Sequence, residues 1–315
     1  MRIWTYPPLA TAQAGFASSP GGPNHSTLSR AKYLARLGVE TVADRAQADL
    51  VHVVGVDCLP DTDVQTIDYI WPVHLYPEDA PGWWREQNDV MRQAIQQARV
   101  VVVNSGYMVR EVERLAGVQA RWIDQAIDLD EGGIEPTGYW RARLKAEDRP
   151  VVIWNKNAID VLRDPAPAAK LARMRPEAVV VLTAEAAQIE RWLGYELPLN
   201  VRCVGRLPYP QMQALLAESD VYLATFCESS GLGHMEALYQ GVPVIGYRWG
   251  GVADISGDVA LLVEPGDVRG LADALDRALA NKAALGPAGR RLIERRHLWQ
   301  IVAPTYKALY EELLS

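Results

Sequence analysis

The segment "DVYLATFCESSGLGHMEALYQGVPVIGYRWGGVADI" (220–255) sets the pattern for the second half of the chain. An apolar run suited to a buried strand leads into a polar turn that contains glycines, and a short helical stretch follows. A second apolar run and a second glycine turn come next. This order of strand, turn, helix and strand predicts a parallel sheet that is covered by helices on both faces.

The same alternation extends outward through most of the 315 residues. Short apolar runs, each expected to form a strand, are separated by stretches with helical spacing of apolar residues. The expected strands include 48–56, 98–105, 150–155, 178–184 and 200–205. The sequence therefore predicts an α/β protein of two doubly wound, Rossmann-like domains that face a central cleft, with ligands at the carboxyl ends of the strands.

Residues 128–149 interrupt the alternation and are expected to link the two domains. The stretch is charged and carries both glycine and proline, which favours a loop. We place the first domain at 1–147 and the second at 148–299. The amphipathic helix at 300–315 is expected to pack back onto the first domain.

Composition limits the class of protein. The chain is 49% hydrophobic and 23% charged, which is typical of a globular protein, and its net charge of −7 argues against a polycationic nucleic-acid binder. Its three cysteines are far apart and show no metal-binding spacing, as expected in a reducing compartment. No apolar run reaches the ~18 residues of a membrane helix, and the start lacks the features of a secretory signal. We expect a cytoplasmic protein without a transmembrane segment.

Two glutamates, Glu228 and Glu236, enclose the Gly-Leu-Gly of the opening segment. This E-x7-E arrangement resembles that of retaining GT-B glycosyltransferases, most closely glycosyltransferase family 4. The resemblance continues through Gly241, Pro243 and Val244, through the Gly250–Gly251 turn, and into "VALLVEPGD" (259–267). Several parts of one pattern in the right order are more specific than two acids alone.

The resemblance implies a role for each part of this segment. Glu228 would contact the donor sugar and Glu236 the ribose of the nucleotide. The backbone N–H groups of Gly231, Leu232 and Gly233 would face the diphosphate, because a helix N-terminus favours anions and glycine permits close approach. The implied reaction retains the anomeric configuration and moves a sugar from a nucleotide-diphosphate donor, UDP-glucose-like, to a hydroxyl acceptor. It needs neither a cofactor nor a metal.

The departing diphosphate requires fixed positive charge. In the family, an arginine and a lysine follow the first strand of the second domain, and this chain departs from that pattern with "VIWNKNAIDVLRDP" (152–165). We expect Lys156 to take this role first and Arg163 second. Arg206, after another strand end, is expected near the nucleotide base.

Candidates in the first domain rest on weaker matches. Gly21 and Gly22 in "SSPGGPNHS" (18–26) would approach the diphosphate. His74 in "IWPVHLY" (70–76) stands where the family has a histidine after a strand. The candidates for acceptor contact are His25, Trp83, Trp84 and Ser105.

Two other functions stay open on the sequence. A DNA-modifying glycosyltransferase acting on hydroxymethylated bases would use Arg85, Arg92 and Arg99, which recur every seven residues on one helix face, and the Trp83–Trp84 pair to stack on a base. A non-catalytic nucleotide-sugar binder would keep Glu236 and the glycine turn without turnover.

One further motif bears on metal binding. The tripeptide "DTD" (61–63) has the D-x-D form that binds metal in a different glycosyltransferase fold, but aspartate-rich turns are common in loops. "GLGHME" is not a complete G-x-G-x-x-G, which disfavours a dehydrogenase. We expect activity that is independent of metal.

Overall fold

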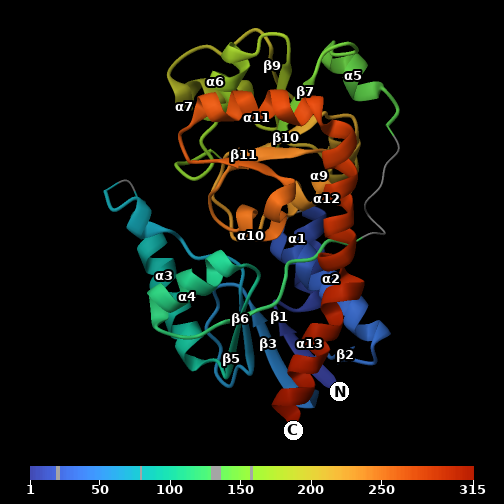
Figure 1. Ribbon diagram of the computed structural model, residues 1–315. Coiled ribbons are helices and arrows are strands. Elements are labelled where there is room, and N and C mark those ends of the chain that lie inside the picture. The colour runs from blue at the N-terminus through green and yellow to red at the C-terminus, as the bar shows by residue number, and fades with distance from the viewer. Residues whose placement is uncertain (19–21, 79, 129–135, 157–158) are drawn as a thin grey trace. The chain divides into compact units, whose positions relative to one another are not determined.

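The computed structural model describes residues 1–18, 22–78, 80–128, 136–156 and 159–315. The chain divides into two compact units, one formed by Met1–Asp128 with Arg296–Ser315 and the other by Leu129–Arg295. Each unit contains a parallel sheet of six strands with helices packed on both faces (Figure 1). The predicted α/β class with two doubly wound units is therefore confirmed.

The second unit begins earlier in the chain than the expected boundary at 147/148. Helix α5 (Tyr139–Leu144) belongs to this unit, and its side chains Trp140 and Leu144 are buried. The Glu218 carboxylate accepts hydrogen bonds from the backbone N–H groups of Thr137 at 3.1 Å and Arg141 at 3.0 Å. These contacts hold a segment whose charge, glycine and proline content suggested a linker.

The first sheet has the strand order β2-β1-β3-β4-β5-β6. Valine-rich strands such as β3 are buried along their whole length, because helices cover both faces of a parallel sheet. The strands are β1 (Arg2–Tyr6), β2 (Glu40–Thr41), β3 (Leu50–Val54), β4 (Val64–Ile67), β5 (Val100–Val103) and β6 (Arg121–Trp122). The helices are α1 (Leu9–Ser18), α2 (Gly22–Arg36), α3 (Gly82–Gln97), α4 (Gly106–Ala116) and α13 (Trp299–Leu314).

The C-terminal helix completes the core of the first unit. Helices α2 and α13 pack against each other on one face of the sheet (Figure 1). Trp299, Tyr306 and Tyr310 of α13 join a buried cluster with Ile3 of β1 and Leu50 of β3. Burial of these aromatic side chains stabilises the docked helix, at roughly 25 cal/mol for each Å² of apolar surface removed from water.

The second sheet has the strand order β12-β11-β10-β7-β8-β9. Strands β7, β8 and β9 follow one another toward one edge of the sheet, and strands β10, β11 and β12 follow one another toward the other edge. The strands are β7 (Val151–Trp154), β8 (Val179–Leu182), β9 (Val201–Cys203), β10 (Val221–Ala224), β11 (Val244–Tyr247) and β12 (Leu261–Val263). The helices are α6 (Ala166–Met174), α7 (Ala186–Leu193), α8 (Tyr209–Ala217), α9 (Leu232–Tyr239), α10 (Val252–Ser256), α11 (Val268–Ala280) and α12 (Lys282–Arg296).

The direction in which successive strands are added to the sheet reverses between the neighbouring strands β7 and β10. The connections that leave these two strands run to opposite sides, which opens a crevice outside their carboxyl ends. Open α/β sheets bind their ligands at such a switch point. The functional site of the second unit is therefore expected in the segments that follow Trp154 and Ala224.

Candidate functional site

Lys156 and Glu228 meet at this switch point. Lys156 lies two residues beyond the end of β7, and Glu228 lies four residues beyond the end of β10. The Lys156 ammonium group donates a hydrogen bond to Glu228 Oε1 and lies 4.1 Å from the centroid of the Phe226 ring. Their side chains are 14% and 24% exposed, so the ion pair is largely shielded from solvent. Two candidates from distant segments thus form one charged contact.

Two glycine turns fix the backbone of Glu228. Gly231 has φ +75°, and a Cβ atom there would lie 2.9 Å from Glu228 Oε2 and 2.8 Å from His234 Nδ1. Gly250 has φ +63°, and a Cβ atom there would overlap the Glu228 carbonyl. The Gly251 N–H donates to that same carbonyl at 2.8 Å. Both turns require glycine because the left-handed backbone and the space leave no room for a side chain.

Gly233, in the first turn of α9, packs against the buried Tyr222 and the partly buried Asn155. A Cβ atom at 233 would lie 2.6 Å from the Tyr222 hydroxyl and 2.8 Å from Asn155 Nδ2. The Tyr222 hydroxyl donates to Asn155 Oδ1. Burial, followed by the charges of Glu228 and Glu236, raises the pKa of Tyr222 well above its usual value. The charges of both carboxylates thus reach the Tyr222 hydroxyl.

Glu236 is buried in α9, with 8% of its surface exposed. Its Oε1 atom accepts a hydrogen bond of 3.1 Å from the hydroxyl of Tyr209, the first residue of α8. The sequence reasoning missed Tyr209, Tyr222 and Asn155. The two tyrosines gave no motif signal, whereas Asn155 directly precedes Lys156 and was within reach of the same argument.

The other two cationic candidates, Arg163 and Arg206, lie at other places in the second unit than Lys156. Arg163 Nη2 donates to Asp160 Oδ2 at 2.5 Å, so its charge is matched by a carboxylate three residues earlier. Arg206 is exposed and follows β9, the edge strand of the sheet, with β8 between β9 and β7. The structure thus brings Lys156 to Glu228 and holds Arg163 on Asp160.

In the first unit, the expected position of His74 directly after a strand is wrong. Strand β4 ends at Ile67, and His74 lies in a 3₁₀ turn at Val73–Leu75. The His74 Nε2 atom is 3.8 Å from Glu111 Oε1. Burial lowers the pKa of His74, with the charge of Glu111 opposing and that of Arg114 adding to the shift. The residue that directly follows β4 is Asp68.

Two of the acceptor candidates have structural roles. Ser105 is fully buried and caps α4, accepting a 3.3 Å hydrogen bond from the Met108 N–H. Trp84 is 1% exposed and stacks on Trp71 at a centroid distance of 4.9 Å. Neither is accessible to an acceptor. Trp83 is 45% exposed and meets the Trp71 ring edge-on at 4.5 Å.

The remaining candidates of the first domain fall on or beside the glycine loop. Gly21 and the side chain of His25 lie outside the described residues. Gly22 is the first residue of α2. Their predicted contacts with diphosphate or acceptor stay predictions.

The predicted arginine stripe is not formed. Arg85 donates to the Pro77 carbonyl at 2.8 Å and Arg92 to the Leu115 carbonyl at 2.9 Å. Arg99 lies beyond the end of α3 and donates to the Leu313 carbonyl at 2.7 Å. Each guanidinium binds a carbonyl of its own unit, and DNA as an acceptor stays a prediction.

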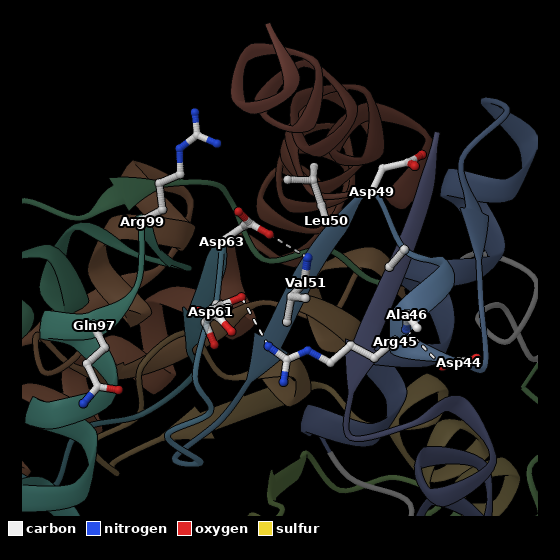
Figure 2. Close-up of a pocket in the computed structure, with 12 residues that line it drawn as sticks. Asp44, Arg45, Ala46, Asp49, Leu50, Val51, Asp61, Asp63, Gln97 and Arg99 are labelled. Atoms are coloured by element: carbon white, nitrogen blue, oxygen red, sulfur yellow. Dashed lines mark hydrogen bonds between the residues drawn. The ribbon is translucent and has the colours of Figure 1, made fainter.

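The "DTD" tripeptide lies in the loop before β4. The Arg45 guanidinium donates a hydrogen bond to the Pro60 carbonyl. It also donates to the Asp61 carbonyl, and Asp63 Oδ2 accepts the Val51 N–H at 2.9 Å (Figure 2). These residues line a pocket of about 850 Å³ at the amino ends of β3, β4 and β5, the edge opposite to that expected for ligands. Over the described ranges, we find no group of three or more His, Cys, Asp or Glu side chains arranged to hold a metal ion.

A helix that spans a membrane needs about 20 mostly apolar residues. In the part of the chain that the structure describes, no helix combines the required length with the required apolar character.

The pair of parallel sheets with flanking helices defines the GT-B class of fold. Sucrose-phosphate synthase from Thermosynechococcus elongatus superposes with a TM-score of 0.80 at 18% identity, over 99% of each chain. HepE of Anabaena, solved in complex with UDP-glucose, superposes with a TM-score of 0.71 at 15% identity, over 99% of this chain and 100% of that chain. These similarities show the fold.

Residues 151–281, which lie in the second unit, match the family described as Glycosyl transferases group 1. A GDP-mannose-dependent monoacylated alpha-(1-6)-phosphatidylinositol monomannoside mannosyltransferase of Corynebacterium glutamicum is 29% identical over 170 residues, 49% of this chain and 45% of that protein. The match thus spans less than half the length of this curated relative. The resemblance to GT-B glycosyltransferases is confirmed, whereas membership of family 4 and the roles of Glu228 and Glu236 stay predictions.

Proposed function

We propose that the protein is a retaining glycosyltransferase that moves a hexose from a nucleotide-diphosphate sugar to a hydroxyl acceptor. The observation that carries the proposal is the Lys156–Glu228 contact at the switch point of a glycosyltransferase group 1 domain. Glu236 acts on the same buried hydroxyl as Glu228, so a cation and two carboxylates serve one site.

Each group suits one part of such a donor. Carboxylates accept hydrogen bonds from hydroxyl groups, so Glu228 fits a sugar and Glu236 a ribose. Helix α9 has no acidic residue in its first turn, and its N-terminal N–H groups favour an anionic diphosphate. We propose a UDP-glucose-like donor first. GDP-mannose is the second candidate, since the corynebacterial relative is named for its use of that donor.

In the proposed reaction, the bond from the anomeric carbon to the acceptor oxygen forms as its bond to the diphosphate breaks. The acceptor attacks on the face from which the diphosphate leaves, and a phosphate oxygen takes the acceptor proton. Lys156 stabilises the charge that develops on the leaving group. This requires the Lys156 ammonium to exchange Glu228 for phosphate, which leaves the Glu228 carboxylate to bind the sugar. No protein nucleophile, cofactor or metal ion takes part.

A thermal-shift screen without metal tests the donor site. UDP, GDP, ADP, TDP and CMP are each compared with and without their common sugars, because a ligand that binds only the folded state raises the melting temperature. We expect one nucleoside diphosphate series to stabilise the protein, and we expect the same labelled donor to be turned over with an acceptor panel. Stabilisation without turnover of any donor would identify a non-catalytic binder. The absence of any shift would refute the proposal.

A further inference from the structure

A buried polar cluster lies under the carboxyl edge of the first sheet, on the face covered by α2 and α13. His52 of β3 is fully buried, with Nδ1 2.7 Å from the Tyr310 hydroxyl and Nε2 2.7 Å from Thr66 Oγ1. Tyr306 adds hydrogen bonds to Thr66 and to Arg30. Burial lowers the pKa of His52 well below its usual value, so the ring is neutral. The polar groups of His52, Thr66 and the two tyrosines therefore have hydrogen-bond partners within the cluster.

Arg30 is the cation of this cluster and is only 3% exposed. Its guanidinium carbon lies 5.6 Å from the centroid of the Tyr306 ring. A buried guanidinium is costly unless negative charge or hydrogen-bond acceptors lie near it. The nearby carboxyl is that of Asp68: burial raises its pKa to about 6, and the charge of Arg30 opposes the rise.

Asp68 occupies a position where a ligand is expected. It directly follows β4, at the carboxyl edge of a doubly wound parallel sheet. Its Oδ2 atom is buried and has no hydrogen-bond partner within the described ranges, although the residue as a whole is partly exposed. Buried acceptors without a donor are rare in folded proteins, so the Asp68 carboxylate has hydrogen-bonding capacity left for a ligand.

We propose that the partly exposed side chain of Asp68, with the charge of Arg30 near it, binds a hydroxyl group of a sugar substrate in the first unit. The sugar hydroxyl donates to the Asp68 carboxylate. The inference rests on the proposed sugar transfer and adds a second sugar contact to it. The sugar is either the one transferred or a sugar of the acceptor.

The test uses the full chain and free D-glucose and D-mannose as probes, observed by saturation-transfer NMR. Wild type, Asp68→Ala and Asp68→Asn are compared with Asp49→Asn. Asp49 directly precedes β3 at the opposite edge of the same sheet and binds Arg2, so it is a matched control. The melting temperature of each variant at pH 7.5 shows whether it is folded.

We expect a hexose signal in wild type and Asp49→Asn that falls at least tenfold in Asp68→Ala. An unchanged signal in Asp68→Ala, or no signal in wild type, would overturn the inference. Nucleoside diphosphate binding, read on the same samples, reports on the proposed function separately. A higher KM for nucleotide sugar in Asp68→Ala assigns the contact to the transferred sugar, and a higher KM for acceptor alone assigns it to the acceptor.

Discussion

Lys156 and Glu228 are bound to each other in the second unit, although 72 positions separate them and each was predicted to bind a different part of one donor. The contact joins the segment after β7 to the segment after β10, and the Phe226 ring lies beneath the ammonium group. An ion pair that is largely shielded from solvent keeps both side chains in defined positions. A donor that binds as proposed would meet oriented charges, and new contacts to phosphate and sugar would offset the energetic cost of separating them.

Replacing Lys156 by alanine is expected to lower kcat by roughly 30- to 1,000-fold, because a fixed charge on the leaving group contributes about 2–4 kcal/mol to transition-state stabilisation. The measurement is steady-state turnover of the donor found by thermal shift. Lys170→Ala, an exposed lysine on α6, is the matched control and should retain activity. Full activity in Lys156→Ala would remove this residue from the site.

Glu236→Ala is expected to weaken nucleoside diphosphate binding by about 10- to 100-fold, as for a lost hydrogen bond to a charged group. Tyr209→Phe removes only the hydroxyl that holds Glu236 Oε1 and should weaken binding less than tenfold. Isothermal titration gives both values. Glu264→Ala, whose side chain is 79% exposed, serves as the control. Equal affinities in all four proteins would show that Glu236 does not contact the nucleotide.

Activity is expected to survive excess EDTA, because Lys156 supplies positive charge for the diphosphate without a metal. The assay compares donor turnover before and after chelation and dialysis. Loss of activity that manganese restores would contradict this prediction. It would also direct attention to Asp61 and Asp63, despite the hydrogen bond that Asp63 accepts from the Val51 backbone.

Asp68 is expected to reduce stability as pH rises. Its pKa in the folded state is about 6, against an ordinary value of 3.8, so its favourable contribution is complete below pH 4 and is lost as pH rises through 6. The shift corresponds to on the order of 3 kcal/mol. Asp68→Asn lacks this titration, so its melting temperature minus that of wild type should increase between pH 4 and pH 6.5. A constant difference across this range would contradict the prediction.

Asp220 is expected to stabilise the second unit. Its carboxylate accepts hydrogen bonds from the Val151 N–H at 2.9 Å, Arg141 Nη2 at 2.7 Å and Lys282 Nζ at 2.6 Å. Burial opposes its ionisation, but these donors outweigh burial and lower its pKa. Alanine at this position leaves partly buried donors unpaired and should cost about 2–4 kcal/mol of unfolding free energy.

The control for Asp220 is Asp276→Ala. Asp276 binds Arg175 at 2.6 Å, but its side chain is 56% exposed, so its loss should cost less than about 1 kcal/mol. Urea denaturation measures both. The stabilisation by Asp220 is present above pH 4 and is lost as pH falls below that value, because its folded pKa is depressed. Equal costs for the two substitutions would show that burial of the carboxylate has no effect.

By itself, the sequence determined the class of fold and the second unit's main candidates. Apolar runs between helical stretches require a buried parallel sheet. Glu228 and Lys156 follow strand-like apolar runs, and Glu236 belongs to the same E-x7-E motif as Glu228, so the pattern and its resemblance to a known family were enough to select all three.

Only the tertiary structure decided which of these residues meet. The strand order that places β7 beside β10 brings Lys156 to Glu228, and packing of α8 against α9 brings Tyr209 to Glu236. Strand β4 ends at Ile67, so Asp68, and not His74, lies directly at the strand end. Trp84 and Ser105 are buried, so Trp84 serves in packing and Ser105 in capping a helix. Such contacts depend on distant segments whose association is governed by the whole core, and no local pattern in the chain encodes them.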